Sequence, residues 1–282
     1  MSRTDALTVS LPLSIIIPVG PGRDASAALT SLLKAGLEEG DEVILVGDGH
    51  KPIIPEMFCS LPLRIDDLDT GSGANAARNR GAAMAVNDIF CFLDDDDAYA
   101  VNALSVLRQR LLEEGDVSAW SLGWSFRSGR SSRSRLRPNW LIEAKIRKRN
   151  LAGGCSSMVL AREAFEAAGG FDPDLPAMQD WDLWLRVVRD RPIKVLSDVS
   201  VIYEDRMDSR ISNDLTRRIA GFTRLLEKYG KYWPLNVIAF HQSRLEAVRY
   251  DSGSGSFLSI FRWRAPFASV YFMWQALRKP KT

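Results

Sequence analysis

The sequence is poor in the residues that build disulfide frameworks. Cys59, Cys91 and Cys155 are odd in number and far apart, and their spacing matches no metal or redox motif. Cys91 falls inside an apolar run, so we expect buried free thiols in a reducing compartment. No signal peptide follows Met1, and no stretch approaches the roughly 20 apolar residues that span a bilayer. These absences argue against a secreted, disulfide-stapled protein and predict a cytoplasmic one.

The chain also lacks a large net charge: basic and acidic side chains nearly balance, and the formal net charge is only +2. Its distribution is uneven, however. Residues 124–150 carry nine basic side chains and one acidic one, and residues 257–282 carry five basic side chains and no acidic one. The rest of the chain is therefore acidic. Basic patches on an acidic body predict an anionic partner, either a phosphate-bearing substrate or a membrane surface.

The first half of the chain alternates between strand and helix patterns. Apolar, β-branched runs predict strands at residues 13–19, 42–46, 61–65 and 89–93. Helices are predicted at 24–37 and 74–86 and near Val101. Near-continuous apolar strands separated by helices predict an α/β fold, with a mostly parallel central sheet covered by helices on both faces.

The second half is less regular. A strand is predicted at residues 156–160, a strand or hairpin at 191–203, and an exposed loop at 125–138. In the helix that follows Gln179, Trp181, Trp184, Leu185 and Val188 lie on one face, as in a helix packed on a core. Two further helices are predicted at 213–229 and 235–250. We expect one α/β domain at 12–205, two helices packed on it at 206–250, and a Gly/Ser linker with a tail at 251–282.

That tail combines aromatic and basic side chains without an acidic one. This composition suits the headgroup region of an anionic membrane, so residues 257–282 are a candidate for peripheral contact with the inner face of the membrane. The alternative is that the aromatic residues pack on the domain or form a dimer contact.

Four consecutive carboxylates, Asp94, Asp95, Asp96 and Asp97, directly follow the apolar strand at 89–93. Like charges so close together must stay hydrated or find a cation. Divalent cations prefer carboxylate oxygens, and ligands of open α/β sheets bind at the carboxyl ends of strands. The run therefore predicts a site for a metal ion and a diphosphate. The alternatives are a solvated loop for the whole run and, for Asp97, a cap of the helix near Val101.

With these features the chain resembles the family 2 inverting glycosyltransferases of the GT-A fold. The resemblance runs from Ser14 to about Arg189 and rests on five motifs in the family's order. They are Ser14–Val19, Glu42–Gly49, Ala77–Gly81, Phe92–Asp97, and Gly169–Asp172 followed by Gln179–Arg186. Each motif is weak alone, but five in order are specific. The resemblance implies a GT-A catalytic domain, and the two helices predicted at 213–229 and 235–250 would form a helical C-terminal extension to it.

The resemblance also implies roles for individual residues. The donor-binding residues would be Pro18, Asp48, Arg78, Asp94 and Asp95. Asp48 would accept a hydrogen bond from the nucleobase, and Asp96, with Asp94, would ligate a Mn²⁺ or Mg²⁺ ion that bridges the diphosphate. The alternatives are a β-turn acid for Asp48 and an exposed helix residue for Arg78.

Asp180 is the candidate general base. Inverting transfer needs one carboxylate to take the proton of the acceptor hydroxyl. Its alternative is an N-cap of a helix that begins at Trp181. Asp182 lies four residues before Arg186, so a helix salt bridge is the better interpretation of that carboxylate. Trp181 and Trp184 are predicted to be core residues rather than platforms for a sugar.

Several positions depart from the family pattern. Gly20-Pro21-Gly22 replaces the usual residues after the first strand, Gly47 replaces an acid, and Gln179 replaces the acid before the base. The only two histidines, His50 and His241, do not follow the base closely, so a histidine metal ligand found in some relatives is missing. These departures bear on the identity of the donor more than on the fold.

The predicted activity is transfer of a sugar from a nucleotide-diphosphate donor, which the family resemblance predicts to be UDP-linked, to an acceptor hydroxyl with inversion. The acceptor would be a surface glycan, a lipid-linked sugar or a protein, and no nucleic acid partner is expected. One alternative is a catalytically silent relative that binds carbohydrate or nucleotide. Another is a nicotinamide-dependent oxidoreductase, because Gly20-x-Gly22-x-x-Ala25 imitates a dinucleotide fingerprint. The oxidoreductase alternative leaves the acidic run unexplained. A nucleotidyltransferase would usually carry a lysine in the first loop, where this chain has only Arg23, and a P-loop is missing from the sequence.

Overall fold

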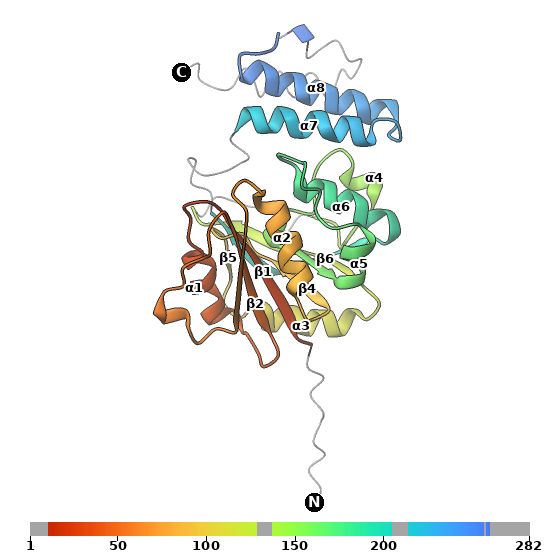
Figure 1. The fold of residues 1–282 in the computed structure, drawn as a ribbon. Coiled ribbons are helices and arrows are strands. Elements are labelled where there is room, and N and C mark those ends of the chain that lie inside the picture. The colour runs from red at the N-terminus through yellow and green to blue at the C-terminus, as the bar shows by residue number, and fades with distance from the viewer. Residues whose placement is uncertain (1–10, 129–136, 205–213, 257, 260–282) are drawn as a thin grey trace, which may run out of the picture.

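The structure is a computed structural model, and it describes residues 11–128, 137–204, 214–256 and 258–259. Its centre is a nine-stranded sheet with helices on both faces (Figure 1). The strands are β1 (Leu13–Val19), β2 (Glu42–Asp48), β3 (Leu63–Leu68), β4 (Ile89–Phe92), β5 (Ala98–Tyr99), β6 (Ala119–Phe126), β7 (Trp140–Leu141), β8 (Met158–Ala161) and β9 (Ile193–Tyr203). The helices are α1 (Ser26–Ala35), α2 (Gly73–Met84), α3 (Ala103–Glu114), α4 (Glu143–Ile146), α5 (Arg162–Ala167), α6 (Gln179–Asp190), α7 (Leu215–Tyr229) and α8 (Leu235–Asp251).

The sheet runs in the order β3-β2-β1-β4-β8-β6-β9-β5, and β7 pairs with β9. From β3 to β4 all strands are parallel. Antiparallel pairing begins where β8 joins β4, and β6 then pairs with β9 in parallel. The predicted α/β fold is confirmed, with its parallel part in the first half of the chain. Such parallel strands place their carboxyl ends at one edge, which is the edge that carries the acidic run.

Alternation along β1 explains why both faces of the sheet are covered. Ile15 and Ile17 pack into a cluster with the apolar residues of α1 and α3, whereas Ile16 packs into a second cluster with α2, α5 and α6. All three isoleucine side chains are fully buried. Because successive side chains of a strand point to opposite faces, the continuous apolar run of β1 serves both clusters at once.

The boundaries differ from the predicted ones mainly in the second half. β8 begins at Met158 rather than Ser156, because Cys155–Ser157 forms a 3-10 turn. Residues 193–203 form one strand, not a hairpin. The predicted loop at 125–138 is wrong at its start, since β6 continues to Phe126 and pairs with Tyr203. Residues 129–136 of that loop lie outside the described residues.

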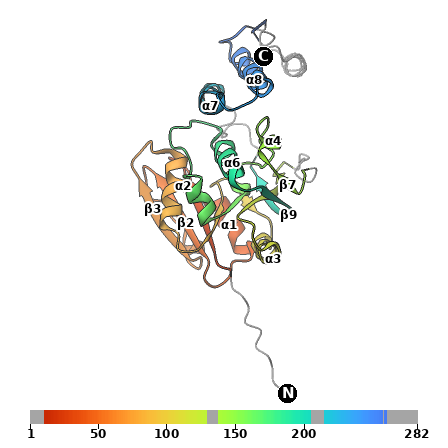
Figure 2. The ribbon, with the colours of Figure 1, turned by 90° about the vertical axis from the view of Figure 1, so that its right-hand side faces the viewer.

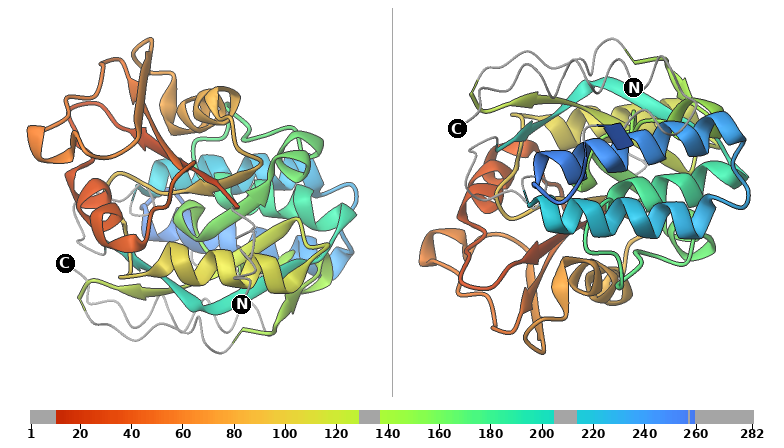
Figure 3. Two further views of the ribbon diagram at one scale, coloured as in Figure 1. Left: turned by 90° about the horizontal axis from the view of Figure 1, so that it is seen from below. Right: turned by 90° about the horizontal axis from the view of Figure 1, so that it is seen from above.

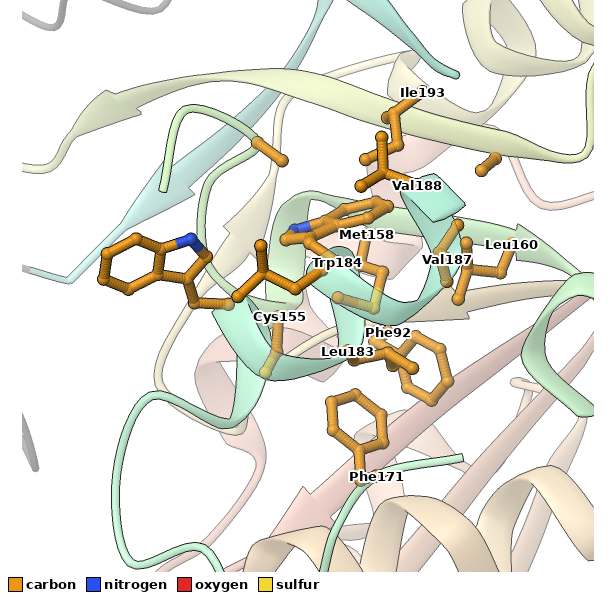
Figure 4. Close-up of a cluster of buried hydrophobic side chains, with 14 of the residues drawn as sticks. Phe92, Cys155, Met158, Leu160, Phe171, Leu183, Trp184, Val187, Val188 and Ile193 are labelled. Atoms are coloured by element: carbon orange, nitrogen blue, oxygen red, sulfur yellow. The ribbon is translucent and has the colours of Figure 1, made fainter. Parts of the chain in front are cut away.

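Helix α6 is fixed by its apolar face. Figure 4 shows Trp184 and Leu183 of α6 over Phe92 of β4 and Met158 and Leu160 of β8. Trp181 is 1% exposed and Trp184 is fully buried. Their indole N–H groups donate to the carbonyls of Ile146 and Gly153 at 2.8 and 3.2 Å. The prediction that both tryptophans belong to the core is confirmed.

Helices α7 and α8 lie side by side beyond α6, as Figures 1 and 2 show from two directions, and Figure 3 shows them from above. Phe222 and Trp233 belong to the same buried cluster as Trp181, and the ring of His241 packs against Trp181 with 5.2 Å between the ring centroids. His241 stacks on Trp233, and its Nε2 lies 2.7 Å from the carbonyl of Arg147. Burial lowers the pKa of His241 to about 4, so this is a neutral core histidine.

The Gly/Ser segment after α8 closes that helix. The N–H groups of Ser252 and Ser254 donate to the carbonyls of Val248 and Arg249, both at 3.0 Å. The basic and aromatic tail at 257–282 falls outside the described residues, apart from Leu258 and Ser259. In the described part of the chain, none of the helices has the length and apolar character that a membrane crossing requires. Membrane contact of the tail and the division into domains stay predictions.

Candidate active site

The carboxyl ends of three neighbouring strands form the candidate site. Strand β1 lies between β2 and β4, so Gly20, Asp48 and the acidic run after Phe92 come to the same edge of the sheet. Pro18 lies inside β1, opposite Val46, and is buried. This is the edge at which open α/β sheets bind ligands.

Asp48 ends β2 and is 7% exposed. Its two carboxylate oxygens accept the backbone N–H groups of Gly71 at 2.9 Å and Gly73 at 3.1 Å. Both glycines have positive φ angles, +87° and +81°, which favour glycine. Asp48 thus holds the loop that leads into α2, as a structural acid would. Its predicted contact with the nucleobase stays a prediction.

Arg78 of α2 forms an ion pair with the first carboxylate of the acidic run. Its side chain is 3% exposed, and one guanidinium nitrogen lies 2.5 Å from Oδ1 of Asp94. Burial alone would lower the pKa of Arg78, but the Asp94 carboxylate raises it above the ordinary value. The guanidinium also lies over the Phe171 ring, 5.2 Å from its centroid. The interpretation of Arg78 as an exposed helix residue is therefore wrong.

Asp95 and Asp96 face a different arginine. One guanidinium nitrogen of Arg23 lies 2.9 Å from Oδ1 of Asp95 and 2.6 Å from Oδ2 of Asp96. The other oxygen of Asp95 accepts the N–H of Gly20 at 3.1 Å. Burial raises the pKa of Asp95 to about 6 against the opposing effects of Gly20 and Arg23. The acidic run is thus not a solvated loop, because arginines hold three of its carboxylates.

Asp97 does not cap a helix. Helix α3 begins at Ala103, and its N-cap residue is Asn102, which has a positive φ angle. Asp97 precedes this N-cap and is buried. Its carboxylate accepts the hydroxyl of Ser156 at 2.5 Å and the N–H of Glu204 at 2.9 Å. The Ser156 hydroxyl accepts in turn from the N–H of Asp94 at 3.0 Å. Burial raises the pKa of Asp97 to about 8. Asp97 is structural, as expected, but it acts through hydrogen bonds with Ser156 and Glu204 and not as a helix cap.

Asp180 lies in the first turn of α6, which begins at Gln179 after Met178, so the N-cap interpretation is wrong. Its Oδ2 accepts a hydrogen bond of 2.8 Å from the side-chain amide of Asn150. Burial raises the pKa of Asp180 to about 6, and the nearby charges of Arg78 and Asp94 act on it in opposite directions. These electrostatic neighbours connect Asp180 to the acidic run, and a pKa near 6 suits a general base.

Asp182, two residues later, belongs to the core. It is fully buried, and its carboxylate pairs with Arg186 at 2.7 Å and with Lys228 at 2.8 Å. The hydroxyl of Tyr229 donates to it at 2.7 Å. The predicted salt bridge to Arg186 is confirmed, and the two partners from α7 show that Asp182 also fastens α7 to α6.

Among the residues that the structure describes, no group of three or more His, Cys, Asp or Glu side chains is arranged to hold a metal ion. All three cysteines are free; Cys91 and Cys155 are buried, as expected, but Cys59 is exposed. The predicted pair of metal ligands, Asp94 and Asp96, is divided between Arg78 and Arg23.

Sequence reasoning missed three residues of this site. Arg23 was noted only as a residue of the first loop, and neither Asn150 nor Ser156 carried a motif. Asn150 lies 30 residues before Asp180 in the chain. It is held by its own turn, because its amide donates to the carbonyl of Gly153 at 2.9 Å and accepts the N–H of Ala152 at 3.0 Å. No local signal predicts that this turn lies beside α6.

Two proteins with similar sequences are both named as glycosyltransferases. A protein of Bacillus subtilis (strain 168), called uncharacterized glycosyltransferase YwdF, is 26% identical over 196 residues, which cover 67% of this chain and 73% of that protein. An uncharacterized glycosyltransferase of Haemophilus influenzae (strain Rd) is 25% identical over 232 residues, which cover 78% of this chain and 77% of that protein.

The fold is also similar to that of a solved structure. Staphylococcus aureus TarS, residues 1–349, in complex with UDP-GlcNAc, aligns with a TM-score of 0.62 at 13% identity and covers 94% of this chain and 90% of that one. At this identity the likeness concerns the fold alone. The family model for Glycosyl transferase family 2 matches residues 14–168, more than half of the chain. With its GT-A fold, its acidic run and its helix α6, the chain belongs to glycosyl transferase family 2.

Proposed function

We propose that the protein transfers a sugar from a UDP-linked donor to an acceptor hydroxyl with inversion, and that Asp180 is the general base. The observation that carries this proposal is the meeting of Asp180, Arg78 and Asp94. Sequence segments about 100 residues apart bring a carboxylate with a raised pKa beside a buried arginine and the acidic run. Such a cluster at a strand edge is typical of a functional site.

Arg78 is suited to the donor diphosphate. Among the described residues its Nε is buried without a hydrogen-bond partner, although one terminal nitrogen is bound to Asp94. An arginine with donors to spare is the side chain that best fits phosphate oxygens. TarS has the same fold and was solved in complex with UDP-GlcNAc, which supports a UDP-sugar as the donor of this chain.

The acidic run fits a divalent cation. Asp95 and Asp96 direct one oxygen each toward the same point, which a guanidinium nitrogen of Arg23 occupies. Carboxylate oxygens are the ligands that Mg²⁺ and Mn²⁺ prefer. A cation bound there would neutralise the charge that develops on the departing diphosphate. Asp96 and its neighbours would hold the cation, and Asp180 would take the proton of the acceptor hydroxyl.

The test separates donor binding from chemistry. Asp180→Asn keeps the acceptor oxygen for Asn150 and should leave the affinity for UDP, measured by calorimetry with Mn²⁺, unchanged. Hydrolysis of the UDP-sugar, with water as the acceptor and UDP release as the readout, should fall by about 10²–10⁴-fold, as expected for loss of a general base.

The matched control is Asp190→Asn at the exposed end of the same helix, which should alter neither quantity. Full turnover in the Asp180 variant would remove that residue from the mechanism. A wild-type protein that binds UDP and never cleaves the donor would instead indicate the catalytically silent relative.

A further inference from the structure

Arg23 lies where a positive charge can act on two carboxylates at once. It follows Gly20-Pro21-Gly22, a tight turn in which the N–H of Arg23 donates to the carbonyl of Gly20 at 3.1 Å and Gly22 has a φ of +68°. From there one nitrogen of its guanidinium reaches Asp95 at 2.9 Å and Asp96 at 2.6 Å. The turn that departs from the family pattern is therefore the turn that places Arg23 on the acidic run.

Arg23 and Arg78 bind the run in different ways. The side chain of Arg78 is 3% exposed, whereas that of Arg23 is 38% exposed. An arginine at the surface of a glycine turn can leave its partners, because water screens the pair and solvates both charges once they separate. A buried arginine cannot do so, because it would leave a charge uncompensated. Of the two, Arg23 is the exchangeable cation.

We propose that Arg23 competes with a divalent cation for Asp95 and Asp96, and that it moves to the donor diphosphate when the cation binds. Arg23 is thus a positioning residue that couples metal binding to nucleotide binding. This inference rests on the proposed function, because it assumes a diphosphate donor at this edge of the sheet. The short turn keeps the displaced guanidinium near the carboxylates, where the phosphates would lie.

The coupling follows from charge. Without nucleotide, a divalent cation has to displace a positive charge that the two carboxylates already hold, so the cation binds weakly. With nucleotide, the displaced guanidinium gains phosphate oxygens as new partners, and both ligands bind more tightly together than apart. Removing the arginine should therefore affect the two ligands in opposite directions.

Arg23→Gln tests this expectation in the full-length protein. Binding of Mn²⁺ alone, measured by the electron paramagnetic resonance signal of the free ion, should become at least about tenfold tighter than in wild type, because no tethered charge competes. Binding of UDP at saturating Mn²⁺, measured by calorimetry, should become about tenfold weaker, because the diphosphate loses an arginine.

Arg80→Gln is the matched control, because Arg80 is a half-exposed arginine of α2 that pairs with Asp66 at 2.6 Å, away from the acidic run. It should change neither affinity. Unchanged or weaker Mn²⁺ binding in Arg23→Gln would overturn the proposal. So would UDP binding that needs Arg23 and ignores Mn²⁺, since Arg23 would then replace the metal ion.

The Mn²⁺ measurement contains no nucleotide, so it reads Arg23 separately from the proposed function. If wild type fails to bind UDP at any Mn²⁺ concentration, the proposed function fails. A tighter Mn²⁺ affinity in the variant would still support competition by Arg23, and an unchanged one would still refute it.

Discussion

The first turn of α6 presents one carboxylate on each of two faces, and the protein holds these two carboxylates in opposite ways. Toward α7, Asp182 is fully buried and has two cations and a tyrosine hydroxyl as partners. Toward the acidic run, Asp180 has one neutral side-chain partner, the amide of Asn150. The two carboxylates are only two residues apart on one helix. Positive charges nearby compensate that of Asp182 fully and that of Asp180 poorly.

The difference separates a site residue from a structural one. A base must carry a charge that the protein does not fully neutralise in advance, and burial raises the pKa of Asp180 to about 6 although the nearby charge of Arg78 lowers it. The same helix needs a rigid support, and the bonds of Asp182 supply it. Asp182 thereby connects the C-terminal helices to the position of the base, although neither helix carries a residue that we assign to the chemistry.

The largest effect should come from the supporting face. Asp182→Ala removes a fully buried carboxylate and leaves the mostly buried Arg186 without its ion-pair partner, while Lys228 keeps Asp172. Breaking such a buried pair costs about 3–5 kcal/mol. We expect the free energy of unfolding, measured in urea, to fall by this amount. The control is Glu227→Ala, which removes the exposed partner of Arg224 and should leave stability nearly unchanged. A loss no larger than that of the control would mean that α7 does not support α6.

The comparison also shows what the sequence could predict. The strands of the first half, the acidic run and the Asp182–Arg186 pair depend on neighbours along the chain, so local patterns indicate them. The partners of Asp180 do not: Asn150 reaches it only because the turn after α4 packs against α6, and Tyr229 reaches Asp182 from a separate helix. The helix cap predicted for Asp97 was wrong for the same reason, since its partners Ser156 and Glu204 are distant in sequence.

A smaller effect should come from the site face, in the pH dependence of turnover. The base must be ionised, so wild-type activity should be lost as the pH falls through about 6, the pKa of Asp180. The Asn150 amide stabilises the ionised form. Asn150→Ala should therefore raise that pKa and move the acidic limb of kcat upward by about one pH unit, with recovery at higher pH.

The acidic limb is read from donor hydrolysis between pH 5 and 9 in about half-unit steps. Asp95 is a competing candidate for the limb, because burial raises its pKa to about 6 as well. Asn150 forms no hydrogen bond with Asp95, so a limb that stays in place in Asn150→Ala would assign it to Asp95 rather than Asp180.

The smallest effect should be a gain of stability at the site face. Burial raises the folded-state pKa of Asp180 above its unfolded value, so ionised Asp180 destabilises the fold. For an acid shifted in this direction, stability is lost as the pH rises from about 4 through 6 and then stays level. Asp180→Asn removes that cost. It should raise the free energy of unfolding by about 1–2 kcal/mol at pH 7.5 and by almost nothing at pH 4, measured by urea titration at both values. Asp190→Asn, whose carboxylate is exposed, should show neither change. A variant less stable than wild type at pH 7.5 would show that Asp180 supports the fold, and the contrast between the two faces of α6 would then fail.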